Sequence, residues 1–138
     1  MWWFYALLSA FFAALTAVLA KIGIKGIDST LATALRTVVV LVLAWGIVLA
    51  RGGLALLPTL SRTNLLFLGL SGLATGLSWL CYFRALQLGP VARVAAVDKL
   101  SVALTIGLAV VVLGEKLTWQ TGLGAGLIVA GTLVLIWP

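Results

Sequence analysis

Residues 91–118 read VARVAAVDKLSVALTIGLAVVVLGEKLT and carry an acid and a base side by side, Asp98 and Lys99, within an apolar run. The run is long enough to cross a bilayer as one helix. A charged side chain at the centre of such a helix costs about 2.5–3.5 kcal/mol even on insertion scales, so these residues are rare and usually functional. We therefore expect this helix to line a cavity and to keep its two charges away from lipid.

The composition extends this conclusion to the whole chain. Of 138 residues, 64% are hydrophobic and only 9% are charged, whereas a soluble domain carries about a quarter charged residues. So short a chain cannot bury that much apolar surface in a water-soluble core. The net charge of +6 comes from bases scattered singly between apolar runs, which is not the clustered pattern of a nucleic-acid-binding protein. The solvent is therefore lipid, and nucleic acid is not an expected partner.

Five apolar runs are long enough to span the membrane. They lie at about residues 3–20, 30–50, 64–83, 91–113 and 119–137. Nothing between them has the length or composition of a soluble domain. We predict a single domain, residues 1–138, in an all-α membrane protein with five transmembrane helices, and we expect it in a prokaryotic-type cytoplasmic (inner) membrane.

An odd number of spans places the two termini on opposite sides of the membrane. Three bases then fall on the side of the N-terminus, Arg51, Arg62 and Lys116, and four on the other side, Lys21, Lys25, Arg84 and Arg93. Because the imbalance of Lys and Arg in short loops sets orientation, such a chain can insert either way round. A fixed topology set by another feature is the alternative.

Polar side chains recur at helical spacing on one face of the third and fourth spans. The stripe comprises Ser71, Thr75, Ser78 and Tyr82 on the third, and Asp98, Ser101 and Thr105 on the fourth. Hydroxyl groups of this kind often do no more than join membrane helices by hydrogen bonds. Together with intramembrane charges they favour a polar path.

The helices that carry Arg36 and Asp98 begin on the same side of the membrane. Each of these two residues lies about 10–12 Å from the start of its helix, so they are at similar depth. In the structural interpretation Arg36 pairs with Asp98, Lys99 reaches the interface, and nothing is bound. In the functional interpretation Asp98 takes up and releases a proton in a way that depends on the substrate. In that case Arg36 and Lys99 are partners of Asp98 or contacts for an anion.

The last span has no charge and carries small residues four apart, Gly122, Gly126 and Ala130. Such a series allows a second helix to approach closely. We interpret it as a subunit interface; packing within the chain is the alternative.

These residues together resemble the EamA domain of the drug/metabolite transporter superfamily over nearly the whole chain. The shared features are Arg36, the Ala85–Gly89 segment ALQLG, the Leu113–Thr118 segment LGEKLT, and a glycine-patterned last helix that includes Gly131. The resemblance implies a five-span unit of which typical members carry two, inserted in opposite orientations. A single unit reaches the same architecture by pairing with itself, so we predict an antiparallel homodimer.

The chain departs from that family at two places. Members often have a proline in the fourth span, near the position where Asp98–Ser101 stands here. The small multidrug relatives use an acid in their first helix for cations and protons, and here Asp98 would have to replace it because the first helix has none.

We predict a secondary transporter of small polar or amphipathic metabolites, with proton coupling through Asp98. A non-transporting subunit or scaffold and a small ion channel are the alternatives. An enzyme is not expected: the chain has no His and a single Cys, Cys81, so that neither a catalytic residue set nor a metal site nor a cofactor is predicted.

Overall fold

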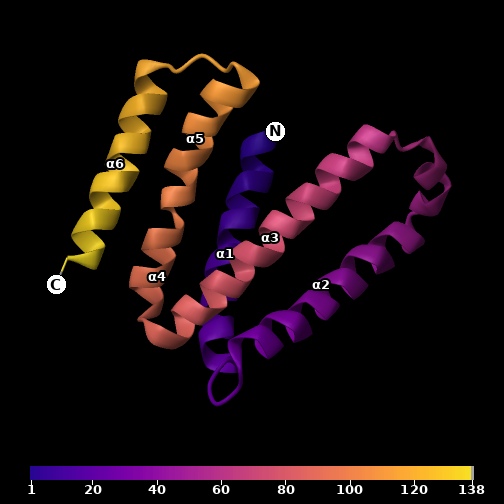
Figure 1. Cartoon of the computed structure of the whole chain (residues 1–138), viewed down its shortest axis with the longest axis horizontal. Helices are drawn as coiled ribbons and strands as arrows, with labels where there is room; N and C mark the ends of the chain where they lie inside the picture. The colour runs from indigo at the N-terminus through magenta and orange to yellow at the C-terminus, as the bar shows by residue number, and fades with distance from the viewer. Residues whose placement is uncertain (138) are drawn as a thin grey trace. The chain divides into compact units, whose positions relative to one another are not determined.

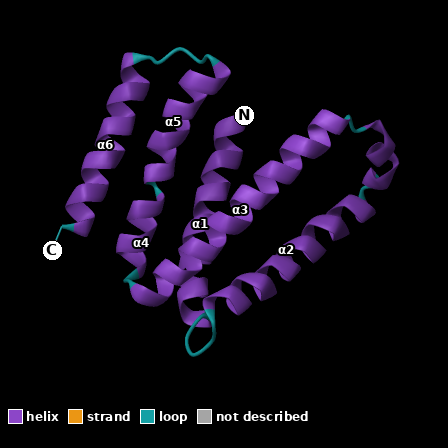
Figure 2. Ribbon diagram, viewed as in Figure 1, coloured by secondary structure: helices purple, strands orange, loops and turns teal. Residues whose placement is uncertain are grey.

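The computed structural model describes residues 1–137, and all the regular elements in this part of the chain are helices, without a strand. The helices run in the order shown in Figures 1 and 2: α1 (Trp2–Gly23), α2 (Ser29–Ala50), the 3-10 helix η1 (Gly53–Thr59), α3 (Arg62–Leu88), α4 (Val91–Asp98), α5 (Leu100–Leu113) and α6 (Trp119–Ile136). An apolar chain in lipid must satisfy its backbone hydrogen bonds within each segment, and the α-helix does so.

Five segments are long and apolar enough to cross a membrane, with α4 and α5 counted together as Val91–Leu113. Few apolar side chains are buried within the described part of the chain: Ala17, Ile24, Ala32, Phe83, Leu86 and Ala96. Most of the large ones, such as Leu43 and Leu104, are exposed. The fold is therefore that of an all-α membrane protein of half-length size, whose apolar surfaces face lipid or another protein.

The third span is longer than the sequence predicts. It was expected to stop at Phe83, but α3 continues to Leu88. Arg84 does not end it, because an arginine near the membrane surface is compatible with helical geometry and a strong helix former. The helix ends where Gly89 and Pro90 follow, since a residue that precedes proline is disfavoured in the helical conformation.

The predicted fourth span is interrupted in the middle. Its two parts, α4 and α5, meet at Lys99, whose N–H donates to the carbonyl of Ala96 at 3.1 Å. The carbonyl of Lys99 in turn accepts from the N–H of Val102 at 3.0 Å. These bonds span three residues, where an α-helix spans four, so the helix is locally tightened. The acid–base pair thus stands at a break in its helix.

Two compact units divide the chain. Unit 1 is Met1–Leu19 with the chain from Leu88 onward, and unit 2 is Ala20–Gln87. Within unit 1, α6 packs against both α4 and α5, as Figure 1 shows. The buried Thr132 of α6 donates from Oγ1 to the carbonyl of Ala96, at 3.1 Å. This bond ties the last span to the break in the fourth.

Within unit 2, α2 and α3 run in opposite directions and are connected through η1 (Figure 1). Near the other end, Lys21 Nζ donates to the carbonyl of Leu86, and Gln87 Nε2 donates to the carbonyl of Ile27 at 2.7 Å. The turn before α2 contains Gly26, whose φ of 77° lies in the left-handed region that favours glycine. These contacts hold the ends of α1 and α3 at the start of α2.

Asp28 caps the N-terminus of α2. Its carboxylate accepts hydrogen bonds from the N–H groups of Leu31, at 3.0 Å, and Thr30, at 2.9 Å. The bond from Leu31 is the main reason why the pKa of Asp28 lies below its ordinary value of 3.8. A cap of this kind satisfies donors that have no partner inside the helix.

We expect the cap to make stability depend on pH in the acid range. Because the pKa of Asp28 is lower in the folded state, its contribution is fully present above a pH of about 3.8 and is lost as the pH falls through the folded-state value. Asp28→Asn keeps a capping oxygen without a titrating group. Thermal unfolding in detergent between pH 6 and pH 3 should therefore show a smaller acid-induced loss of stability for the Asn variant. Equal losses in the two proteins would contradict this account.

We expect Thr132→Val to destabilise the protein by about 0.5–1.5 kcal/mol, because it removes a buried hydrogen bond at nearly constant volume. Unfolding of the purified protein by a denaturing detergent measures this loss. Thr105→Val is the matched control, since Thr105 lies on the exposed face of α5. A Thr132 variant as stable as the control would show that the bond does not hold α6 to α4.

Candidate functional site

The acid–base pair of the fourth span forms an ion pair. Lys99 Nζ lies 3.6 Å from Asp98 Oδ2, and the two side chains are 59% and 39% exposed, respectively. Neighbouring residues on a regular helix point about 100° apart and do not face each other, so the long lysine side chain has to turn back to its neighbour. Within unit 1 the ion pair is loose, and both side chains are partly exposed.

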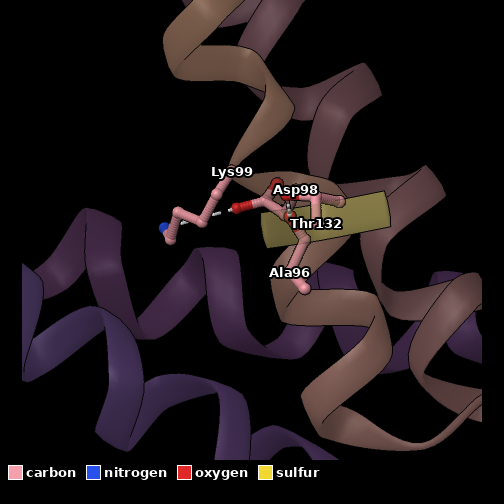
Figure 3. Close-up of polar contacts among 4 residues, drawn as sticks. All are labelled: Ala96, Asp98, Lys99 and Thr132. Carbon is pink, nitrogen blue, oxygen red and sulfur yellow. Dashed lines mark hydrogen bonds and ion pairs between the residues drawn. The ribbon is translucent and has the colours of Figure 1, made fainter. Parts of the chain in front are cut away.

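The break between α4 and α5 lies at the same level of unit 1 as this ion pair. Figure 3 shows Thr132 at the carbonyl of Ala96 and the Lys99 side chain extended beside Asp98. Broken membrane helices expose backbone polar groups that can take part in binding. Two charged side chains and a tightened backbone therefore meet at one level of the span, with Thr132 as the contact from α6.

Unit 2 contains the third predicted charge, Arg36. Its guanidinium carbon lies 4.2 Å from the centre of the Trp79 ring and 5.5 Å from that of Phe83. Both distances are within the range of a cation–π interaction. Phe83 is buried, whereas Arg36 and Trp79 are half-buried. We call Trp79 and Phe83 the aromatic platform.

The nine predicted site residues fall into two groups. Unit 1 holds Asp98, Lys99, Ser101 and Thr105, and unit 2 holds Arg36, Ser71, Thr75, Ser78 and Tyr82. Thr75 Oγ1 donates to the carbonyl of Ser71 at 2.9 Å, which satisfies its hydroxyl within α3. Ser78, Ser101 and Thr105 are exposed. A common passage that joins the two groups, and the pairing of Arg36 with Asp98, remain predictions.

The small residues of the last span border a groove. This groove, of about 670 Å³, is lined by Gly122, Gly126 and neighbouring side chains of α6, among them Trp119 and Leu123. Ala130 lies two turns beyond Gly122 and is exposed. A side-chain β-carbon built at Gly122 or Gly126 would meet no atom of the chain within 4 Å. The small-residue face is therefore open, as a subunit interface would require.

Sequence reasoning missed three residues of this site, namely Trp79, Phe83 and Thr132. The signal for the first two is their spacing of four, which places them on one face of α3 beside the predicted polar stripe. Thr132 is the hydroxyl-bearing residue in the otherwise apolar second half of α6. Buried polar groups in lipid need partners, so such an isolated threonine predicts a bond to a neighbouring helix.

The chain matches the EamA-like transporter family over residues 1–137. A protein of Sinorhizobium sp described as "Uncharacterized transporter in cobO 3'region" is 53% identical over 134 residues, which cover 97% of this chain and 95% of that protein. The relative is thus about the same length as this chain. No solved structure gives a significant match. The break in the fourth span, the five apolar helices and these similarities agree, and the chain belongs to the EamA-like transporter family.

Proposed function

We propose that this protein is a secondary transporter that moves small polar or amphipathic metabolites across the cytoplasmic membrane, coupled to protons, as an antiparallel homodimer. The observation that carries the proposal is the break of the fourth span at Asp98 and Lys99. Family membership supports the transport role. The break supports this location for the site, because transporters commonly bind ions and substrates where a membrane helix is discontinuous.

In this proposal, proton coupling acts through the loose ion pair. While Asp98 is ionised it holds Lys99 at 3.6 Å, and a proton on the carboxylate removes that attraction. The lysine is then released to contact an anionic group of the substrate. Because both side chains are accessible, the exchange requires no opening of a packed core. Proton binding and substrate binding are in this way linked at one pair of residues.

The hydroxyl groups supply the rest of the path. Ser71, Ser78 and Tyr82 lie along α3, and Ser101 and Thr105 follow the charged pair on α5. In the proposed dimer these stripes face a passage shared by two copies. Short polar side chains of this kind offer both donors and acceptors to a substrate that leaves water.

Two observations support pairing with a second, inverted copy. The loop bases divide three to four between the two sides, so neither orientation is strongly favoured. The groove along Gly122 and Gly126 offers a surface on which a helix of the partner can pack closely.

We expect Asp98→Asn to abolish the pH dependence of transport while leaving the protein folded, because asparagine has nearly the same shape and cannot exchange a proton. The measurement is uptake by proteoliposomes with and without an imposed pH gradient. Glu115→Gln, in the turn before α6, is the matched control and should behave like the wild type. Flux of the Asp98 variant that is still driven by pH would remove this carboxylate from the coupling step.

We expect Gly126→Leu to weaken the dimer, because a β-carbon at this position meets no atom of the chain within 4 Å and the larger side chain would obstruct the close approach of a partner helix. Gly124→Leu is the matched control, since Gly124 points about 200° away around the helix and also has open space. Single-molecule or cross-linking analysis in bilayers measures the dimer fraction. Equal dimer fractions for the two variants would place the interface elsewhere. Labelling of only one terminus from one face of the membrane would contradict antiparallel insertion.

A further inference from the structure

Arg36 carries a charge that unit 2 does not neutralise. It stands seven residues after Ser29, the first residue of α2, and so about 10 Å along the helix. The only acid in the sequence of unit 2, residues 20–87, is Asp28. That carboxylate is engaged with the N–H groups of Thr30 and Leu31 at the start of α2. Within this unit, therefore, the guanidinium faces rings and no carboxylate.

The side chain also does not turn toward the near membrane surface. Trp79 lies nine residues before Leu88, the end of α3, and Phe83 only five. The guanidinium is closer to the deeper ring, at 4.2 Å against 5.5 Å. A long basic side chain whose sole need is solvation would instead reach outward to the headgroups. The geometry thus holds the charge inward.

The aromatic platform offers ring faces to the guanidinium and no hydrogen-bond acceptor. The N–H donors of a guanidinium point outward in its plane and match the two oxygens of a carboxylate. A cation–π contact contributes about 0.5–2 kcal/mol, which is less than the cost of a charge at membrane depth. Within unit 2, the platform contacts Arg36 without supplying an opposite charge.

We propose that Arg36, held on Trp79 and Phe83, is the binding point for a carboxylate group of the transported substrate. The inference rests on the proposed transport function and narrows its substrates to monocarboxylates. One guanidinium balances the single charge of a carboxylate. A phosphate monoester carries a charge of about −1.5 to −2 at neutral pH and would remain partly uncompensated. Trp79 is the positioning residue, because its ring lies 4.2 Å from the guanidinium carbon.

The test measures equilibrium binding and needs no transport. Purified protein in detergent is titrated with three acids, acetate, hexanoate and benzoate, and with the amide of each, and ligand-induced thermal stabilisation gives the dissociation constant. Phenyl phosphate is titrated in the same way, as a comparison anion of higher charge. We expect at least one acid to stabilise the protein while its amide does not. Arg36→Gln should raise the dissociation constant of that acid by about tenfold or more, as expected when a charged hydrogen bond is lost.

Further variants separate the effect of the guanidinium's shape and position on acid binding from the effect of its charge. Arg36→Lys keeps the charge but loses the planar fork, so the acid should bind more weakly than to the wild type. Trp79→Leu should weaken binding by about threefold or more, and Trp79→Phe should restore much of it because a ring remains. Arg93→Gln removes the same charge from an exposed position of α4 and should leave binding unchanged.

The proposal is overturned if no acid of the series binds, if amides or phenyl phosphate bind as well as the acids, or if Arg36→Gln and Arg93→Gln have equal effects. The proposed transport can fail separately. Binding that depends on Arg36 without any flux in proteoliposomes would contradict transport and uphold the carboxylate site. Flux of a substrate that has no carboxylate, if it is unaffected by Arg36→Gln, would uphold transport and contradict the carboxylate site.

Discussion

The structure depends on the cost of leaving a polar group without a partner in lipid. Backbone groups meet this constraint by forming helices, and side chains meet it by finding neighbours. The partners of three polar groups within the spans can be traced. Lys99 contacts Asp98, Thr132 contacts the backbone of Ala96, and Arg36 contacts Trp79 and Phe83. Arg36 differs from Lys99 because its contacts, Trp79 and Phe83, carry no negative charge.

The break in the fourth span shows how this constraint shapes the site. Members of the family that the chain resembles often have a proline near this level, which would account for a break by the loss of an N–H and by steric conflict. Here no proline is present, and the helix is still interrupted at Lys99. The bond from Thr132 to Ala96 adds a donor at the site of the interruption. A side chain that hydrogen-bonds into the backbone is a recognised cause of helix distortion.

Much of the fold could be predicted from the sequence, because apolar runs of membrane-spanning length allow one outcome in lipid. The five spans, the small-residue face of α6 and the level of Asp98 follow from spacing alone. The break at Lys99 could not be predicted, since no residue there opposes the helix and the side chain that bonds to the nearby carbonyl of Ala96, Thr132, lies 36 positions from Ala96. The platform under Arg36 was missed for a similar reason. Trp79 and Phe83 read as ordinary apolar residues until α2 and α3 are placed side by side.

The charges of the two units differ in a way that bears on energetics. Within the membrane-spanning segments, unit 1 holds a neutral pair, Asp98 with Lys99, and unit 2 holds the positive charge of Arg36. Under the proposed function, a carboxylate bound at Arg36 makes the interior of one copy neutral. A proton on Asp98 then leaves the charge of Lys99 unbalanced until that proton is released. Movement of one proton with one monocarboxylate would thus carry no net charge across the membrane, and it would avoid the cost of about 2.3 kcal/mol per charge for each 100 mV of potential.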